Sequence, residues 1–315
     1  YPNGFPNGLT LRGSPINQSQ PGEVFWVNST TVLAKGGVGG SNGNPGTYLK
    51  PFSTLTYALT QCTANRGDVI MLMPGYTQTI SNATDLTFAV AGVAIIGLGT
   101  GTLRPTITSD TAVTACVAVS AANMSIKNCI FTADFADVSE VFTLTATDFH
   151  MEDLKITQTA TNKNYIELVD TGTGDNDCDG LSMLRCEWIE ADASTTSAIN
   201  VDIDLDRLSV IDCYFDLGVN GVLSVIAEVA AGKDLTNVNI TDNYCSRLVT
   251  ASAVGLITFA DTTTTNTGLM RNNIWRSLDT AGELLVTAGS NITFDNNKAT
   301  SVIDKSGYLL PAADA

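Results

Sequence analysis

The sequence predicts an all-β fold, a single-stranded parallel β-helix that follows an N-terminal arm and a short capping helix. Three observations support this prediction: a seven-residue frame that recurs along the second half of the chain, segments that alternate apolar and polar residues, and a composition rich in Asn, Thr, Asp and Val. Asn and Asp favour turns, whereas Val and Thr favour strands. The expected domains are residues 1–50 (arm and glycine-rich connector), 51–67 (capping helix), 68–305 (β-helix) and 306–315 (C-terminal tail).

The recurring frame has consistent chemistry at four of its positions. Its copies begin at Ser125, His150, Ser182, Ser209, Asn239, Leu269 and Thr293. The second position is always apolar, the fourth is Asn or Asp except for Arg185, and the seventh is mostly large and apolar. The fifth position is Cys or Leu in the first four copies and Asn in the last three, at steps of 24 to 32 residues (Cys129, Leu154, Cys186, Cys213, Asn243, Asn273, Asn297).

Few architectures repeat at this period. Helical repeats need apolar residues at helical spacing, whereas segments such as residues 201–206 and 141–147 alternate with period two. A propeller blade needs about 40 residues. Coils of 24 to 32 residues with short strands therefore indicate a parallel β-helix, in which equivalent residues form ladders along the stack.

The fifth frame position predicts part of the interior. Its cysteines are expected to face inward as small apolar side chains. Metal binding by them is the less favoured alternative, because no close set of Cys and His residues completes a ligand shell. The three asparagines predict a stacked amide ladder at a turn, where Asn tolerates a left-handed backbone.

Residues 51–62 suit a cap, because the end of a β-helix exposes an open edge and an uncovered core. Ser53 or Thr54 can cap a helix, and Leu55, Ala58 and Leu59 then share one face. The glycine-rich residues 34–46 lack the ending of a phosphate loop, so they are interpreted as a flexible connector. Residues 1 to about 30 contain Pro-Asn-Gly twice, and we expect an extended arm that reaches a neighbour.

Charge and cysteine usage exclude several function classes. The formal net charge of −16 argues against partners such as nucleic acid or an anionic membrane. No apolar run approaches the roughly 20 residues of a membrane span. The seven cysteines form no CxxC pair, which indicates thiols kept reduced in a cytosol rather than a disulfide framework.

The segment GGSNGNPGTYLKPFSTLTYALTQCTANRGDVIMLMPGYTQTI, residues 39–80, resembles the opening of right-handed parallel β-helix proteins of the pectate-lyase-like superfamily. Together with YPNGFPNGLTLRGSPI, residues 1–16, it is similar to virion proteins of tailed bacteriophages. The resemblance implies a capsid decoration protein, a head fibre or a tail spike on the virion surface, assembled in the host cytoplasm. It also implies the major capsid protein or other virion proteins as partners, and a homotrimer.

Enzymes of the superfamily cut polysaccharides, and the resemblance implies two kinds of site: Ca²⁺ with a basic residue in lyases, and paired carboxylates in hydrolases. Asp202, Asp204 and Asp206 alternate with apolar residues, so they are candidate catalytic carboxylates about 7 Å apart along a strand. The alternative, an ordinary solvent face of an acidic β-helix, is favoured because nothing else marks this strand as a cleft.

Residues 174–180, GDNDCDG, contain the candidate metal ligands. Asp175, Asp177 and Asp179 resemble the first half of a calcium loop. The motif is incomplete, because position twelve is Cys186 and Glu187 comes one residue late. An acidic, solvated turn between coils is the alternative to Ca²⁺ binding, and no other cofactor is expected.

Two further observations weigh against an enzyme. His150 is the only histidine, and its column of mainly small polar residues indicates a surface turn. Phe, Trp and Tyr make up 7% of the chain, and several occupy the apolar seventh position, so few remain as sugar platforms. The leading expectation is a structural virion protein, a capsid decoration protein held through its arm and base. The alternative is a tail-spike-like protein that binds or degrades a host surface glycan, as a glycoside hydrolase or a polysaccharide lyase.

Overall fold

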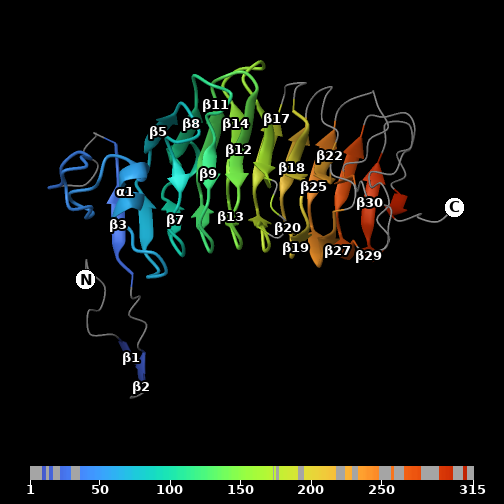
Figure 1. The fold of residues 1–315 in the computed structure, drawn as a ribbon, viewed down its shortest axis with the longest axis horizontal. Coiled ribbons are helices and arrows are strands. Elements are labelled where there is room, and N and C mark those ends of the chain that lie inside the picture. Colours follow the sequence, from blue (N-terminus) through green and yellow to red (C-terminus); the bar gives the residue numbers. More distant parts are fainter. Residues whose placement is uncertain are drawn as a thin grey trace.

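The structure is a computed structural model that describes residues 9–11, 14–16, 22–29, 36–172, 174, 177–190, 195–217, 224–228, 233–247, 257–258, 266–277, 291–300 and 308–310. Over these residues the chain is a parallel β-solenoid, whose coils stack along one axis and build three long sheets (Figure 1). The described residues contain one α-helix and one 3-10 helix, η1 (Gly101–Leu103). The all-β fold predicted from the sequence is confirmed.

The first sheet holds ten parallel strands. In chain order they are β3 (Val24–Val27), β4 (Val69–Leu72), β7 (Ala94–Gly97), β10 (Ser125–Lys127), β13 (His150–Glu152), β16 (Ser182–Leu184), β20 (Ser209–Ile211), β24 (Val238–Thr241), β27 (Thr267–Arg271) and β29 (Asn291–Asp295). The second position of the predicted frame forms one continuous register along this sheet (Ile126, Met151, Met183, Val210, Ile240, Met270, Phe294). The sequence frame therefore corresponds to one coil of the solenoid.

The second sheet also holds ten strands, of which the last is antiparallel. They are β5 (Thr77–Ile80), β8 (Thr106–Ser109), β11 (Ile130–Ala133), β14 (Lys155–Gln158), β17 (Glu187–Glu190), β21 (Tyr214–Leu217), β25 (Tyr244–Arg247), β28 (Ile274–Ser277), β30 (Asn297–Thr300) and β31 (Tyr308–Leu310). Residues 306–315 were expected to form a tail, but β31 lies on the last strand of this sheet. A strand added antiparallel covers an edge that a parallel stack leaves open.

The third sheet is shorter, with seven strands. They are β6 (Thr87–Phe88), β9 (Val117–Val119), β12 (Val138–Leu144), β15 (Tyr165–Asp170), β18 (Ser197–Val201), β22 (Ser224–Glu228) and β26 (Ile257–Thr258). A separate two-stranded sheet pairs β19 (Leu205–Asp206), which follows β18 in the chain, with β23 (Leu235–Thr236), which follows β22. Each complete coil thus contributes one strand to each of the three long sheets.

A tight corner joins the first sheet to the second in the seven coils that carry the frame. The fourth frame residue of all seven copies adopts a left-handed backbone with φ between 51° and 59° (Asn128, Asp153, Arg185, Asp212, Asp242, Asn272, Asn296). Asn and Asp tolerate this conformation better than other non-glycine residues. The left-handed column is therefore the fourth position, whereas the sequence prediction had assigned it to the asparagines at the fifth.

The fifth frame residue points into the core, and its asparagines form the predicted amide ladder. Asn243 Nδ2 donates to Asn273 Oδ1 at 2.9 Å, and Asn273 Nδ2 donates to Asn297 Oδ1 at 2.9 Å. The same oxygens accept the backbone N–H groups of Asn243 and Asn273 at 3.0 Å. These buried amides are therefore satisfied by one another, as buried polar groups must be. The cysteines of this column are buried as predicted.

Helix α1 (Leu55–Gln61) lies at the N-terminal end of the solenoid and packs against β3 and β4 (Figure 1). Thr54 is the N-cap, and its side chain accepts the Tyr57 N–H at 3.2 Å. The predicted face of Leu55, Ala58 and Leu59 is buried. The helix is shorter than the expected segment 51–67, because Cys62 is already extended.

The segment before α1 differs from the expected arm and flexible connector. Strand β3 lies within residues 1–50 yet pairs in parallel with β4 in the first sheet. The glycine-rich residues that follow are bonded to it, since Trp26 N donates to Gly46 O at 2.8 Å and Gly40 N donates to Ser29 O at 2.9 Å. A Cβ on Gly40 would lie 1.9 Å from the Asn28 carbonyl oxygen, so only glycine permits this approach.

The described part of the expected arm contains a short hairpin. Strands β1 (Leu9–Leu11) and β2 (Ser14–Ile16) pair antiparallel, with Leu9 opposite Ile16. Both Pro-Asn-Gly tripeptides lie outside the described residues. The prediction that residues 1 to about 30 reach onto a neighbour stays a prediction.

Candidate functional site

The three candidate catalytic carboxylates lie at a bend of one coil. Strand β18 ends at Val201 and β19 begins at Leu205, so Asp202, Asp204 and Asp206 do not follow one continuous strand as expected. The apolar residues between them are buried as predicted, with Val201 and Ile203 at 0% and Leu205 at 1% exposure. The apolar side chains hold the bend in the core, which directs the carboxylates away from it.

Two of these carboxylates bond the neighbouring coil. Asp206 Oδ1 accepts hydrogen bonds from Thr236 Oγ1 and from Asn237 Nδ2, each at 2.7 Å. These hydrogen bonds hold the pKa of Asp206 below its usual range, and the bond from Asn237 has the larger effect. Asp204 Oδ1 accepts the Asp234 backbone N–H at 2.9 Å. Both carboxylates thus act as links between successive coils.

Asp202 has a different environment. Its partial burial raises the pKa of its carboxyl group, and the negative charge of Asp170 adds to the effect. Its backbone N–H donates to Thr171 Oγ1 at 3.3 Å on the preceding coil. Asp202 therefore lies beside the acidic residues of the third sheet rather than beside Asp206.

The candidate calcium ligands do not converge among the described residues. Asp175 lies outside them. Asp179 Oδ1 accepts the Asp206 N–H at 2.8 Å, and the intervening Cys178 is buried with its thiol near Leu144 O at 3.1 Å. Over the part of the chain that the structure describes, no group of three or more His, Cys, Asp or Glu side chains is placed to hold a metal ion. The described residues thus do not form a calcium ligand set, and Ca²⁺ binding stays a prediction.

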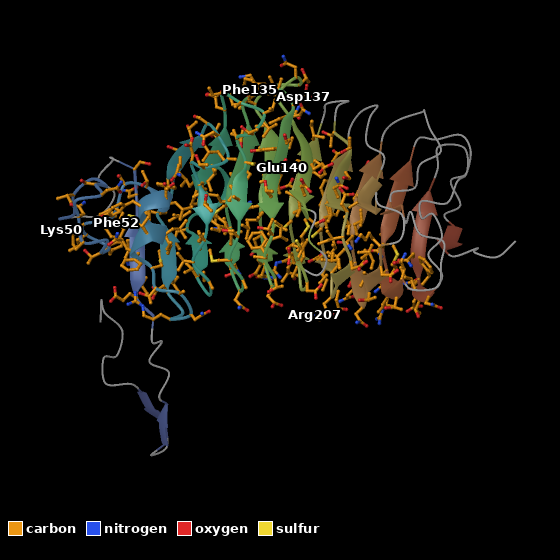
Figure 2. All side chains as sticks on the ribbon, viewed as in Figure 1. Lys50, Phe52, Phe135, Asp137, Glu140 and Arg207 are labelled. Atoms are coloured by element: carbon orange, nitrogen blue, oxygen red, sulfur yellow. The ribbon has the colours of Figure 1, made fainter. Side chains whose placement is uncertain are left out.

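An acidic cluster on the third sheet was missed by the sequence analysis. Glu140 on β12 lies directly opposite Glu167 on β15, and Asp170 follows on the same strand. Figure 2 labels Glu140 among the central coils, and only 9% of this residue is exposed. Like charges at opposed positions repel each other, so this pairing disfavours two ionised glutamates.

Glu167 responds to this environment. The pKa of Glu167 is raised to about 7, chiefly by burial and also by the charges of Asp170 and Glu140, against the lowering effect of two hydrogen bonds. Those bonds come from Asn200 Nδ2 at 3.1 Å and Thr196 Oγ1 at 3.2 Å, both to Oε1. A carboxyl group with a pKa raised to about 7 can act as a general acid near neutral pH.

One sequence signal marks this cluster. Glu140 and Glu167 are 27 residues apart, which is one coil, and each lies in a β-rich segment. The seven-residue frame covers the corner between the first two sheets, so it does not show which residues of the third sheet lie opposite each other. A search for repeated acidic positions one coil apart finds the pair.

His150 begins β13 on the first sheet, rather than lying in a surface turn. Its Nε2 is 3.8 Å from Glu152 Oε2. Its column neighbours are Ser125 and Ser182. Among the described residues no hydrogen bond joins His150 to either serine, so the activated Ser–His contact that nucleophilic catalysis uses is not formed there.

Comparison with known proteins gives similarity of fold. No family model matches the chain, and no curated protein matches it. Among solved structures it is similar to the pectin methylesterase from Aspergillus niger (13% identity, TM-score 0.49, 90% of this chain and 86% of that chain) and to pectate lyase Pel9A (12%, 0.49, 93% and 82%). It is also similar to ORF18 of Geobacillus virus E2 (14%, 0.40, 78% and 57%). At these identities the likeness concerns the fold and not the activity.

No helix in the described residues has both the length and the apolar character that crossing a membrane requires.

Proposed function

We propose that the chain is a structural protein of a tailed-phage particle, most specifically a capsid decoration protein. The observation that carries this proposal is the use of its acidic side chains as links between coils. Asp179, Asp204 and Asp206 each accept a hydrogen bond from the next coil. Carboxylates fixed in this way stabilise a rod, whereas an acid–base catalyst needs a carboxyl group free to exchange a proton.

Two hydrogen-bonded ladders and the net charge support a structural role on a particle. The buried amides of Asn243, Asn273 and Asn297 are stacked in successive coils. A second, exposed ladder runs beside them from Asn296 through Asn272 to Asp242. The net charge of −16 keeps particles that carry many copies apart by repulsion.

The assignment to a phage particle rests on the resemblance of residues 1–16 and 39–80. Under this proposal the N-terminal arm and the end covered by α1 contact the major capsid protein or sibling subunits, and three copies associate. The protein lies on the virion surface after assembly in the host cytoplasm. Neither nucleic acid nor membrane is a partner.

Co-sedimentation with capsids tests this proposal. The full chain should sediment with capsids that lack it, and a variant without residues 1–20 should remain in the supernatant because the arm is absent. The matched control is a Leu9→Ala variant of the full chain, which changes one side chain in the arm but keeps its length. Equal binding by the truncated and full chains, or no binding by either, would reject attachment through the arm.

A second function is favoured by one observation, the cluster of Glu140, Glu167 and Asp170. The raised pKa of Glu167 and the neighbouring carboxyl groups of Glu140 and Asp170 suit the hydrolysis of a host surface glycan. If the protein is a hydrolase, Glu167→Gln should abolish the release of reducing ends, whereas Asp204→Asn should preserve it because Asp204 bonds the Asp234 backbone. Absence of release by the unmodified chain on a panel of host polysaccharides rejects this function.

A further inference from the structure

The interior column of the fifth frame position brings two thiols together. Cys186 immediately precedes β17 and Cys213 immediately precedes β21, and these strands pair in parallel with Glu187 opposite Tyr214. The two cysteines are therefore neighbours on adjacent coils. Adjacent strands lie about 4.8 Å apart, which is within the Cα separation of about 4.4–6.8 Å that a disulfide spans.

The sulfur of Cys213 already reaches the coil that holds Cys186. The Cys186 backbone N–H donates to Cys213 Sγ at 3.4 Å. Cys186 Sγ instead lies 3.8 Å from Met151 O, on the coil before it. A disulfide therefore requires the Cys186 sulfur to turn from the Met151 coil toward Cys213. Both residues are 2% exposed, and both are free thiols.

We propose that Cys186 and Cys213 are a disulfide-forming pair that joins two adjacent coils when the protein meets a peroxide. One thiol sulfur attacks a peroxide oxygen, the O–O bond breaks, and a sulfenic acid and water are formed. The second thiol sulfur then attacks the sulfenic sulfur and expels water. Two thiols are oxidised and one hydrogen peroxide is reduced, which yields one disulfide and two waters.

The burial of the pair selects the oxidant. Hydrogen peroxide is small and uncharged, so it penetrates a packed interior more readily than glutathione disulfide or another bulky reagent. The pair is also isolated from the other thiol of its column, because Leu154 occupies the coil between Cys129 and Cys186 and is itself 1% exposed. Cys129 is therefore a matched control that is equally interior but lacks a thiol neighbour in this column.

The bond would constrain the unfolded chain. Its two ends are 27 residues apart (213 − 186), close to one coil. Closing a loop of this size removes conformational freedom from the unfolded state, so the oxidised protein should melt higher than the reduced one by roughly 5 °C. The inference does not depend on the proposed function.

The test treats the folded full chain with hydrogen peroxide, removes the peroxide with catalase, and alkylates the remaining thiols with N-ethylmaleimide in urea. Five of the seven thiols (7 − 2) should be alkylated. Mass spectrometry of a digest should find a peptide pair linked through Cys186 and Cys213 and lighter by two hydrogen atoms. Cys129→Ser should form the same link, and dithiothreitol should reverse it.

Two variants make the result decisive. Cys186→Ser and Cys213→Ser should each lose the link and the rise in melting temperature, and Cys186→Ala serves if the serine variant does not fold by circular dichroism. Seven alkylated thiols would overturn the proposal. So would separate sulfinic acids at the two positions, links to other cysteines or between chains, or a link that forms only in urea.

Discussion

Replacing Asn273 by alanine should break the buried amide ladder at its centre. Asn273 Oδ1 accepts both donors that Asn243 directs at it, the backbone N–H at 3.0 Å and Nδ2 at 2.9 Å. Its Nδ2 donates to Ile240 O at 2.8 Å and to Asn297 Oδ1 at 2.9 Å. Alanine removes all four hydrogen bonds and leaves two buried donors of Asn243 without this acceptor.

The magnitude follows from these losses. A buried donor without a partner costs about 1–3 kcal/mol, and side-chain Nδ2 of Asn243 keeps one bond to Val210 O. Water that enters the space left by the amide recovers part of the loss. We expect Asn273→Ala to lower the free energy of unfolding by about 2–4 kcal/mol.

Urea unfolding followed by circular dichroism measures this change, and the variant should shift the midpoint. The control is Asn272→Gly in the exposed ladder, where glycine keeps the left-handed backbone (φ +56°) and removes bonds that water replaces. In the control, the free energy of unfolding should fall by less than about 1 kcal/mol. Equal losses for the two variants, or a loss below about 1 kcal/mol for Asn273→Ala, would refute the structural role of the inner ladder.

Three other predictions follow from the core, the acidic cluster and the cap. Cys213→Asn should extend the buried amide ladder by one coil. Its new amide can accept the Cys186 N–H and donate to Met183 O, as the amide of Asn243 does with the equivalent groups of its own neighbouring coil. A decrease of more than about 2 kcal/mol in the free energy of unfolding, measured in urea, would contradict this prediction. Glu167 has a folded pKa of about 7, so the folded state holds an extra proton between the unfolded pKa near 4.3 and pH 7. The free energy of unfolding therefore falls as the pH rises from about 4.3 to about 7 and levels off above it. Glu167→Gln should therefore be more stable than the unmodified chain by about 1–2 kcal/mol at pH 8 and equal to it at pH 4; a constant difference across this range would exclude the linkage. Leu55→Ala should lower the free energy of unfolding by about 2–5 kcal/mol because Leu55 is fully buried on the inner face of the cap helix. Thr60→Ala, on the exposed face of the same helix, should lower it much less in the same urea experiment.

The coil register was predictable because each turn of the solenoid repeats the same physical demands. The inward second position of the frame is apolar in every copy, and a left-handed corner favours Asn or Asp. Arg185 shows the limit of this reasoning, since it adopts φ 51° against its preference. Its guanidinium pairs with Glu152 and Asp153 on the preceding coil, so partners outside the local sequence offset the strain.

The early part of the chain was less predictable. Strand β3 is separated from its partner β4 by a glycine-rich loop and α1, and its short apolar run shows no repeat. The loop reads as a connector by composition, yet Asn44 Nδ2 donates to Pro51 O at 2.8 Å and Ser53 N donates to Asn42 Oδ1 at 3.1 Å. Such hydrogen bonds within a loop leave no periodic signal in the sequence.

The candidate site illustrates a similar limit. The alternation of residues 201–206 correctly indicates which side chains face the core. It does not reveal that Asp204 and Asp206 bond groups about 30 residues later in the chain. The opposition of Glu140 and Glu167 depends on the register of the third sheet, which the frame at the corner does not define.

Cryo-electron microscopy of the assembled particle tests the proposed structural role most directly. The proposal predicts many copies of the solenoid at regular positions over the head, with the end covered by α1 against the capsid. A few copies at the tail tip would contradict capsid decoration and favour the glycan-binding spike. Particles without any solenoid density would reject both virion roles.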